Sequence, residues 1–177
     1  MKKLSQPTSI PERPVFRGCD VEELWLVPGY RRNLPHLRLE AAHGSVAKAL
    51  EFFHGQRVWV GDYVVMPNHV HVLAQPFPGV ALEDWLYSIK RFTSTELGKD
   101  AALSDRLATR QGHLWQTESF DRIVRGVEEL GRTRRYIANN PAKLRPGTFA
   151  LKQIEWLDEF APRSSSTFQC RVEGQRA

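Results

Sequence analysis

The sequence is poor in cysteine and has none of the long apolar runs of a membrane protein. Its only two cysteines, Cys19 and Cys170, stand near opposite ends outside any C-x-x-C pair, so we expect reduced thiols and no disulfide scaffold. Lys2 and Lys3 are followed by polar residues and Pro7, which does not resemble a signal peptide. Internal repeats are also lacking. We therefore expect a cytoplasmic protein with no membrane contact.

Length and composition are those of an ordinary globular protein. The 177 residues suffice for one domain with a real core, and the fractions of hydrophobic (41%) and charged (25%) residues are typical. A net charge of +5 and a pI of about 9.5 favour an anionic partner, of which nucleic acid is the commonest, although such mild basicity is weak evidence.

The clustering of basic residues says more than their number. Seven of them surround one tyrosine, Tyr136: Arg122, Arg125, Arg132, Arg134, Arg135, Lys143 and Arg145. Such a cluster can bind phosphates, and the alternative is a solvated helix face without a partner.

The N-terminal segment, residues 1–43, is predicted to be irregular. Prolines at positions 7, 11, 14, 28 and 35 break any long helix there. One apolar piece, residues 24–27, can form a short strand. After it, Ser45 is a suitable cap for a helix. The apolar residues of that helix recur at steps of four and three: Val46, Leu50 and Phe53.

The middle of the chain predicts two strands and a helix. Residues 58–66 are rich in β-branched and aromatic side chains, which favours a strand. Pro67-Asn68 is a turn signal, so residues 69–73 should form a second, antiparallel strand. Residues 80–97 carry apolar side chains at steps of three and four, which is typical of an amphipathic helix.

The remaining third has a less regular pattern. Residues 98–112 indicate a polar connection, and residues 114–124 an extended segment. A further helix over 127–137 should stop before Pro141, because a residue before proline is pushed out of helical geometry. Residues 146–177 should form a partly loose C-terminal extension. The order helix, strand, strand, helix, strand, helix predicts an α+β fold in which helices cover a sheet.

Two histidines, His69 and His71, flank one hydrophobic residue, Val70. Residues two apart in a strand point to the same face, so both imidazoles should project together while Val70 turns to the core. Two imidazoles on one face supply half of a metal site. The H-x-H pattern is weak by itself, because an ordinary pair of partly exposed strand histidines is about equally compatible with it.

Tyr136 and Asn140 are four residues apart and should share one face of a helix. Leu130 and Ile137 mark a different, core-facing stripe, so Tyr136 need not be buried. Judged from these residues alone, a packing tyrosine at a helix edge, with Asn140 ending the helix, is the commoner arrangement.

Five blocks of sequence stand in a recognisable order. They are Met66-Pro67-Asn68-His69-Val70-His71-Val72, Ile89-Lys90-Arg91-Phe92-Thr93, Leu114-Trp115-Gln116, Ser119-Phe120-Asp121-Arg122-Ile123-Val124-Arg125 and Arg134-Arg135-Tyr136-Ile137-Ala138-Asn139-Asn140-Pro141-Ala142-Lys143-Leu144. Together they resemble the HUH single-tyrosine transposases, and most closely the branch of REP-associated tyrosine transposases. The resemblance covers residues 44–144.

This resemblance implies a fold, an activity and a site. It implies a ferredoxin-like antiparallel sheet covered by helices, with a catalytic domain over residues 44–145. The implied enzyme is a metal-dependent DNA transposase that nicks and rejoins single-stranded DNA next to hairpins through a 5′-phosphotyrosine. Tyr136 would be the nucleophile, and His69, His71 and Asn140 would bind Mg²⁺ or Mn²⁺, with Asn139 as a neighbouring alternative. A monomer or homodimer in the cytoplasm, associated with the nucleoid, is expected.

Contacts to single-stranded or hairpin DNA are expected from basic side chains and from aromatic rings. The predicted DNA-binding residues are Arg91, Trp115, Arg122, Arg125, Arg134, Arg135 and Lys143. Trp115 and Phe120 are able to stack on unpaired bases, but the sequence is equally compatible with core packing of both rings.

The sequence departs from the family where the first strand of the sheet is expected. Residues 39–44 run almost directly into a helix. Either residues 24–27 substitute for that strand or the strand is lost, which would leave an exposed sheet edge. Loss of the strand favours an alternative function, that of a catalytically inactive DNA-hairpin-binding relative. A plain interaction module with a chance H-x-H pattern is a third possibility.

Overall fold

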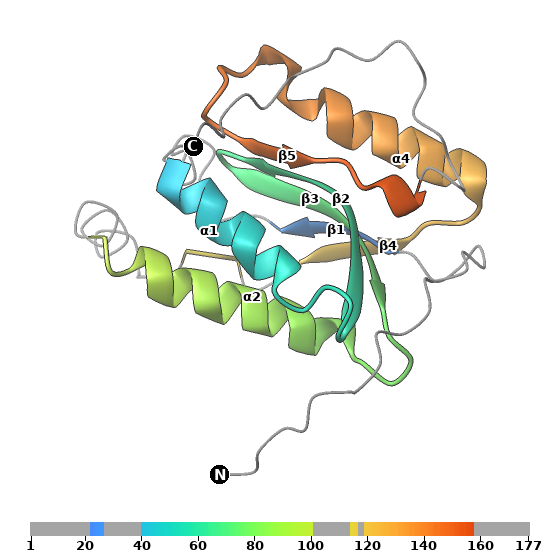
Figure 1. Cartoon of the computed structure of the whole chain (residues 1–177), viewed down its shortest axis with the longest axis horizontal. Coiled ribbons are helices and arrows are strands. Elements are labelled where there is room, and N and C mark those ends of the chain that lie inside the picture. The colour runs from blue at the N-terminus through green and yellow to red at the C-terminus, as the bar shows by residue number, and fades with distance from the viewer. Residues whose placement is uncertain (1–21, 27–39, 101–113, 117–118, 158–177) are drawn as a thin grey trace, which may run out of the picture.

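The centre of the molecule is a five-stranded antiparallel sheet (Figure 1). The computed structural model describes residues 22–26, 40–100, 114–116 and 119–157. The strands are β1 (Glu22–Leu26), β2 (Val58–Met66), β3 (His69–Pro76), β4 (Phe120–Ile123) and β5 (Ala150–Lys152). Their spatial order is β4-β1-β3-β2-β5. The prediction of an α+β fold built on an antiparallel sheet is confirmed.

Helices cover both faces of this sheet (Figure 1). The larger core lies under α1 (Glu40–Glu51) and α2 (Leu82–Leu97), where Trp85 and the valines of the central strands are buried. On the other face, α4 (Val127–Asn139) buries Leu130 and Ile137 against β2 and β3. The sheet therefore separates two cores, and side chains of β3 alternate between them.

The hairpin of β2 and β3 matches the prediction from local pattern. β2 has the predicted bounds, Pro67 and Asn68 form the turn, and β3 continues to Pro76, three residues beyond the predicted end. The pairing between the two strands is irregular between Val60 and Tyr63. Such a bulge redirects side chains and increases the local twist.

The strand that the sequence left in doubt is present. β1 pairs with β3 on one side and with β4 on the other, so a strand precedes the first helix, as the expected ferredoxin-like sheet requires. The alternative in which this strand is lost is therefore wrong. Of the predicted N-terminal segment 1–43, the structure describes β1 and the first turn of α1.

The start of α1 differs from the prediction. The helix begins at Glu40, and Ser45 lies inside it and does not cap it. Ala42 and His43 are buried, so the first turn already packs on the rest of the protein. Burial of this turn, together with the high helix propensity of alanine, extends the helix past the expected cap.

The chain after residue 145 contributes more structure than a loose extension. β5 pairs with β2, with Val65 opposite Ala150, and the short 3-10 helix η3 (Glu155–Leu157) buries Leu157 on the α4 side. The sequence analysis did not predict β5 or η3, because a three-residue strand has no recognisable period. The sheet thus includes strands on either side of the predicted 44–145 domain.

Several predictions concern residues outside the described part of the chain. These are the two cysteines, most of the 98–112 connection, and the end of the C-terminal extension from residue 158. Among the described residues, no helix combines the length and the apolar character needed to cross a bilayer.

Candidate functional site

The histidines of β3 and the tyrosine of α4 meet on the α4 face of the sheet. The rings of His69 and His71 are edge to face with their centroids 4.9 Å apart. The ring of Tyr136 lies at the same centroid distance, 4.9 Å, from His71, and its hydroxyl oxygen is 3.4 Å from His71 Nε2. The side chain of Asn140 hydrogen-bonds to His69. The structure thus brings together all four residues that the sequence singled out for chemistry.

Local structure explains how these side chains converge. Alternation along β3 turns Val70 into the larger core and both histidines toward α4. On α4, burial of Leu130 and Ile137 fixes the rotation of the helix. Tyr136 consequently lies at the rim, 51% exposed, with its ring edge on His71.

Asn140 follows directly from the end of α4. The helix ends at Asn139, and the backbone N–H of Asn140 donates to the carbonyl oxygen of Tyr136. The chain then continues as the 3-10 helix η2 (Asn140–Lys143), which accommodates Pro141. This ending agrees with the predicted stop before Pro141 and holds the Asn140 side chain near His69.

Burial favours the neutral form of both imidazoles. Burial away from water is the main reason why the pKa of His71 is lowered to about 4, and electrostatic repulsion from His69 is the second. Desolvation also lowers the pKa of His69, although the hydrogen bond with Asn140 opposes this. His69 Nδ1 is 2.8 Å from Asn68 Oδ1, a contact that favours the tautomer with the proton on Nδ1 and the lone pair on Nε2. Neutral imidazoles of defined tautomer are the form that binds metal ions.

By their chemistry, these three side chains could hold a divalent cation. Two imidazole nitrogens and one amide oxygen provide three neutral ligands. Among the described residues, no cluster of three or more His, Cys, Asp or Glu side chains could hold a metal by itself. An incomplete set leaves coordination positions for water and phosphate oxygens, as Mg²⁺ and Mn²⁺ sites that act on phosphates require.

Arg134 is a buried structural residue, which corrects its prediction as a DNA contact. Its Nε donates to Asp62 Oδ2 at 2.8 Å, and its Nη2 donates to Asp62 Oδ1 at 3.4 Å. The side chains of Arg134 and Asp62 are only 3% and 0% exposed. Ile154 joins this network through its backbone. Its carbonyl oxygen accepts a hydrogen bond from Arg134 Nη2, and its N–H donates to Asp62 Oδ1. The bulge in β2 aims Asp62 at α4.

The two aromatic residues considered for stacking have different environments. Trp115 is buried, and its indole N–H donates to Thr93 Oγ1 at 2.7 Å, so its prediction as a DNA-binding residue is wrong. The sequence alone predicts an extended segment, in which the ring could be exposed, but the ring packs under α2, where its burial stabilises the larger core. Phe120 of β4, by contrast, is 58% exposed.

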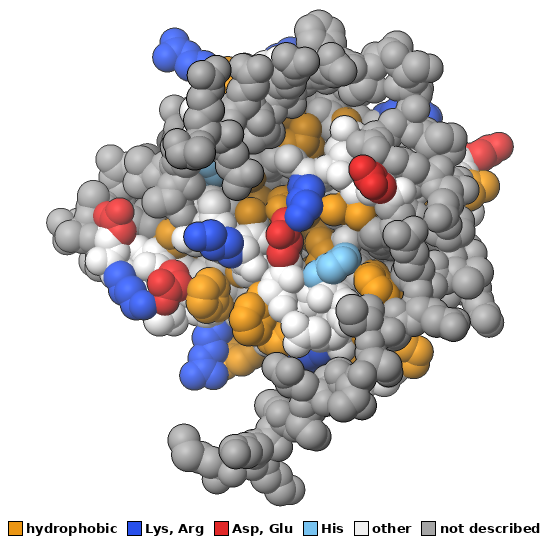
Figure 2. Space-filling model, in the orientation of Figure 1, with side chains coloured by type: hydrophobic (Ala, Val, Ile, Leu, Met, Phe, Trp, Pro, Cys, Tyr) orange, Lys and Arg blue, Asp and Glu red, His pale blue; other side chains and the backbone are white. Residues whose placement is uncertain are grey.

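The other predicted DNA contacts are exposed but do not form one patch. They are Arg91, Arg122, Arg125, Arg135 and Lys143. Arg122 forms an ion pair of 2.9 Å with Glu129. Arg91 belongs to α2 and therefore lies on the opposite side of the sheet from Tyr136. On the face seen in Figure 2, basic and acidic side chains of the described residues are interspersed.

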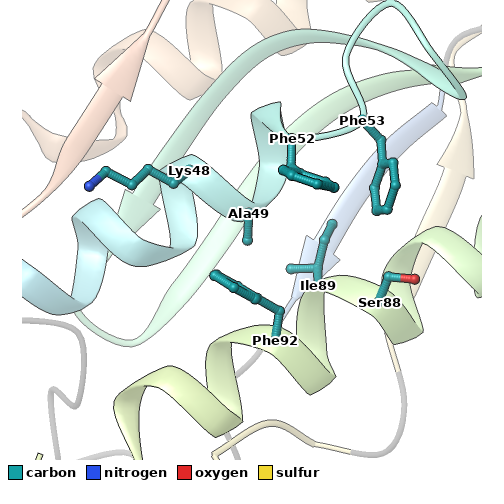
Figure 3. Close-up of a pocket in the computed structure, with 7 residues that line it drawn as sticks. All are labelled: Lys48, Ala49, Phe52, Phe53, Ser88, Ile89 and Phe92. Carbon is teal, nitrogen blue, oxygen red and sulfur yellow. The ribbon is translucent and has the colours of Figure 1, made fainter. Parts of the chain in front are cut away.

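A cavity of about 230 Å³ lies between α1 and α2, away from the histidines. Phe52, Ile89 and Phe92 surround it (Figure 3). The rest of its lining consists of Lys48, Ala49, Phe53 and Ser88. The sequence analysis did not predict this cavity. The one signal for it was Phe92, which lies beside the buried side of α2. The lining has no pair of groups able to perform acid–base or metal chemistry.

Comparisons with known proteins agree with this geometry. The profile of the family described as "Transposase IS200 like" matches residues 23–140, which extends from β1 to Asn140. No curated protein matches the sequence.

Several solved structures resemble the chain, and two of them follow. One is a REP-associated tyrosine transposase bound to a REP hairpin, with a TM-score of 0.53 and 18% identity over 77% of this chain and 74% of the other. The second is a protein from Deinococcus radiodurans named as a candidate transposase, with a TM-score of 0.47 and 16% identity over 73% of this chain and 96% of the other. At such identity, the first likeness shows a shared fold.

Proposed function

This chain belongs to the family of IS200-like transposases, and we propose that it nicks and rejoins single-stranded DNA next to hairpins, with Tyr136 as the nucleophile. The observation that carries the proposal is the position of the Tyr136 hydroxyl, 3.4 Å from Nε2 of His71. Half of this side chain is open to solvent, so a strand of DNA has access to the hydroxyl.

In the proposed reaction, Tyr136 attacks a phosphodiester in line. Its phenolic oxygen forms a bond to phosphorus, and the bond from phosphorus to the 3′ oxygen of the preceding nucleotide breaks. The products are a 3′-hydroxyl and a 5′-phosphate linked to Tyr136. Because the phosphotyrosine is still a diester, a 3′-hydroxyl can attack it in turn and restore a DNA strand without a nucleotide cofactor.

His69, His71 and Asn140 are the residues that would hold Mg²⁺ or Mn²⁺. When bound, such a cation stabilises the negative charge that develops on the phosphate oxygens during attack. The chain's own contribution is to favour the neutral form of both imidazoles and to place Nε2 of His71 3.4 Å from the tyrosine hydroxyl. Rigid support for this arrangement comes from β3 and from the buried Arg134–Asp62 pair below α4.

Hairpin DNA is the proposed partner. The proposal is supported by the fold that this chain shares with a transposase whose structure was solved in complex with a REP hairpin. Arg125, Arg135 and Lys143 are exposed and are the proposed phosphate contacts. An inactive hairpin-binding relative was the alternative from sequence. Its main ground was the loss of the first strand, and β1 removes that ground.

The test is cleavage of labelled single-stranded DNA containing hairpins, with and without Mn²⁺. We expect metal-dependent nicking and a protein–DNA adduct that survives denaturation. Tyr136→Phe should abolish both without changing the fold, whereas Tyr87→Phe, which alters an exposed tyrosine of α2, should change neither. Nicking by Tyr136→Phe would refute the nucleophile. Metal-independent DNA binding without nicking, across several hairpins, would favour the inactive relative.

A further inference from the structure

We propose that Asn68 is a positioning residue of the site, whose side-chain oxygen fixes the orientation and the tautomer of the His69 imidazole and so leaves Nε2 to bind a divalent cation. The inference deepens the proposed function, because it rests on His69 as a metal ligand. It gives a role at the site to a residue that the sequence marks only as part of a turn.

The hairpin turn sets the contact between Asn68 and His69. Pro67 and Asn68 are the two turn residues between β2 and β3, and His69 is the first residue of β3, opposite Met66. Asn68 Oδ1 is 2.8 Å from His69 Nδ1, an ordinary distance for a hydrogen bond from a ring N–H to an oxygen. Because the two residues are neighbours in a tight turn, the bond orders few additional dihedral angles.

His69 depends on such a contact more than His71 does. The His71 side chain is only 2% exposed, and the Tyr136 ring lies edge to face with it at a centroid distance of 4.9 Å. His69 is half-buried, beside the turn. The torsion angle that rotates an imidazole has two broad minima, which exchange the sides of the ring. Packing therefore confines His71, whereas the hydrogen bond with Asn68 selects one of the two orientations of His69.

The tautomer decides which nitrogen atom of His69 is able to bind a metal. A neutral imidazole has one N–H and one nitrogen lone pair, and only the lone pair coordinates a cation. An acceptor oxygen at Nδ1 keeps the proton there and leaves the lone pair on Nε2. Histidines that bind metals usually donate their other N–H to an oxygen, which orients the ring and makes the ligating nitrogen more basic. Asn68 Oδ1 is such an oxygen.

Asn140 is the second side chain that hydrogen-bonds to His69, and it is itself a proposed ligand. As a ligand, Asn140 would direct its oxygen to the cation. Asn68 belongs to the turn and serves Nδ1 whether or not a cation is bound. The test therefore has to separate the effects of the two asparagines on the His69 ring.

The first measurement reads the tautomer without metal or DNA. Long-range proton–nitrogen NMR spectra of the full-length, metal-free protein distinguish protonated from unprotonated ring nitrogens at about pH 8.5, where imidazoles are neutral. We expect the His69 proton on Nδ1. His54 is an internal control with the opposite tautomer, because its Nδ1 accepts a 3.0 Å hydrogen bond from the backbone N–H of Val60.

Two substitutions separate the oxygen of Asn68 from its place in the turn. Asn68→Gly keeps a residue suited to turns but removes the acceptor, so the His69 proton should redistribute toward Nε2. Asn68→Asp keeps an acceptor oxygen and should hold the proton on Nδ1. Asn140→Ala removes the other partner and should also leave the proton on Nδ1. The His54 signals should be the same in all variants, and thermal unfolding verifies each fold.

The second measurement is the Mn²⁺ affinity of the same proteins in calorimetry. Removing the partner that orients a metal-binding histidine typically weakens metal binding, so Asn68→Gly should bind Mn²⁺ roughly 10- to 100-fold less tightly than the wild type. Asn68→Asp should bind at least as tightly as the wild type, because its carboxylate accepts the same N–H and adds a negative charge. A residue that only shapes the turn would change neither the tautomer nor the affinity.

The outcomes separate this proposal from the proposed function. A His69 proton on Nε2 in the wild type, or one that stays on Nδ1 in Asn68→Gly, would overturn the proposal even if the wild type nicks DNA. Unchanged Mn²⁺ affinity in Asn68→Gly would overturn it as well. The expected tautomers in a wild type that binds no Mn²⁺ would support the orienting role of Asn68 and count against the metal site of the proposed function.

Discussion

Replacing Arg134 by methionine should destabilise the protein by about 3–5 kcal/mol, because the change leaves the Asp62 carboxylate buried without its cation. The Asp62 side chain is fully buried and accepts both guanidinium hydrogen bonds, at 2.8 and 3.4 Å. After the substitution, the Ile154 backbone N–H would still donate to Oδ1, but a neutral donor does not replace the positive charge of the guanidinium. Native proteins are stable by about 5–15 kcal/mol in total, so the loss is large.

The same reasoning predicts that a second substitution restores stability. In the double variant Asp62→Leu with Arg134→Met, no charge remains in the interior, and two apolar side chains of similar volume pack in its place. Such replacements of buried ion pairs are often neutral or stabilising. Arg135→Met is the control: Arg135 is the exposed neighbour on the same helix, and its loss should cost less than about 0.5 kcal/mol.

The assay is unfolding in urea of the wild type, both single variants, the double variant and the control. The free energies of unfolding form a double-mutant cycle, and its coupling energy measures the interaction between Asp62 and Arg134. A cost below about 1 kcal/mol for Arg134→Met, similar to that of Arg135→Met, would refute the reasoning, because a buried and uncompensated carboxylate cannot be that inexpensive.

Three further changes should have measurable effects. Gly61→Ala would place a Cβ 2.8 Å from Leu157 Cδ1 and should cost about 1–3 kcal/mol in urea unfolding; an unchanged midpoint would contradict this packing. His54 accepts a hydrogen bond from the Val60 N–H, and burial lowers the pKa of its imidazole below 6.5. As the pH drops through 6.5, the imidazole is therefore protonated in the unfolded state before it is protonated in the folded state, and the free energy of unfolding should fall. His54→Ala should flatten that dependence, and an unchanged slope would remove His54 as its source. His69→Ala should weaken Mn²⁺ binding in calorimetry, and unaltered affinity would exclude it as a ligand.

The features that could be predicted from sequence are those encoded by a local period. The alternation through His69 and His71 fixes which side chains share a face, and the spacing of Leu130 and Ile137 fixes the buried side of α4. Both patterns are complete within a few residues. The hairpin and the approach of Tyr136 to the histidines follow from them, together with the fold implied by the family resemblance.

The features that could not be predicted depend on partners far apart in the chain. Arg134 looks like one more cation in a basic cluster, and only its contact with Asp62, 72 positions earlier, shows that it is buried. Trp115 is similar, since its partner Thr93 lies on another element. β1 could be predicted only in part, as a short strand over residues 24–27, and β5, with three residues, is too short to show a period. Pairing with longer neighbours gives both strands their conformation.

The measurement that tests the central claim most directly is mass spectrometry of the protein–DNA adduct after digestion with trypsin and nuclease. Cleavage after Arg135 and Lys143 releases the peptide 136–143, whose sole tyrosine is Tyr136. The account predicts that the nucleotide phosphate is attached to this peptide and to no other. An adduct on the peptide that contains Tyr87, the exposed tyrosine of α2, would contradict the assignment of the nucleophile.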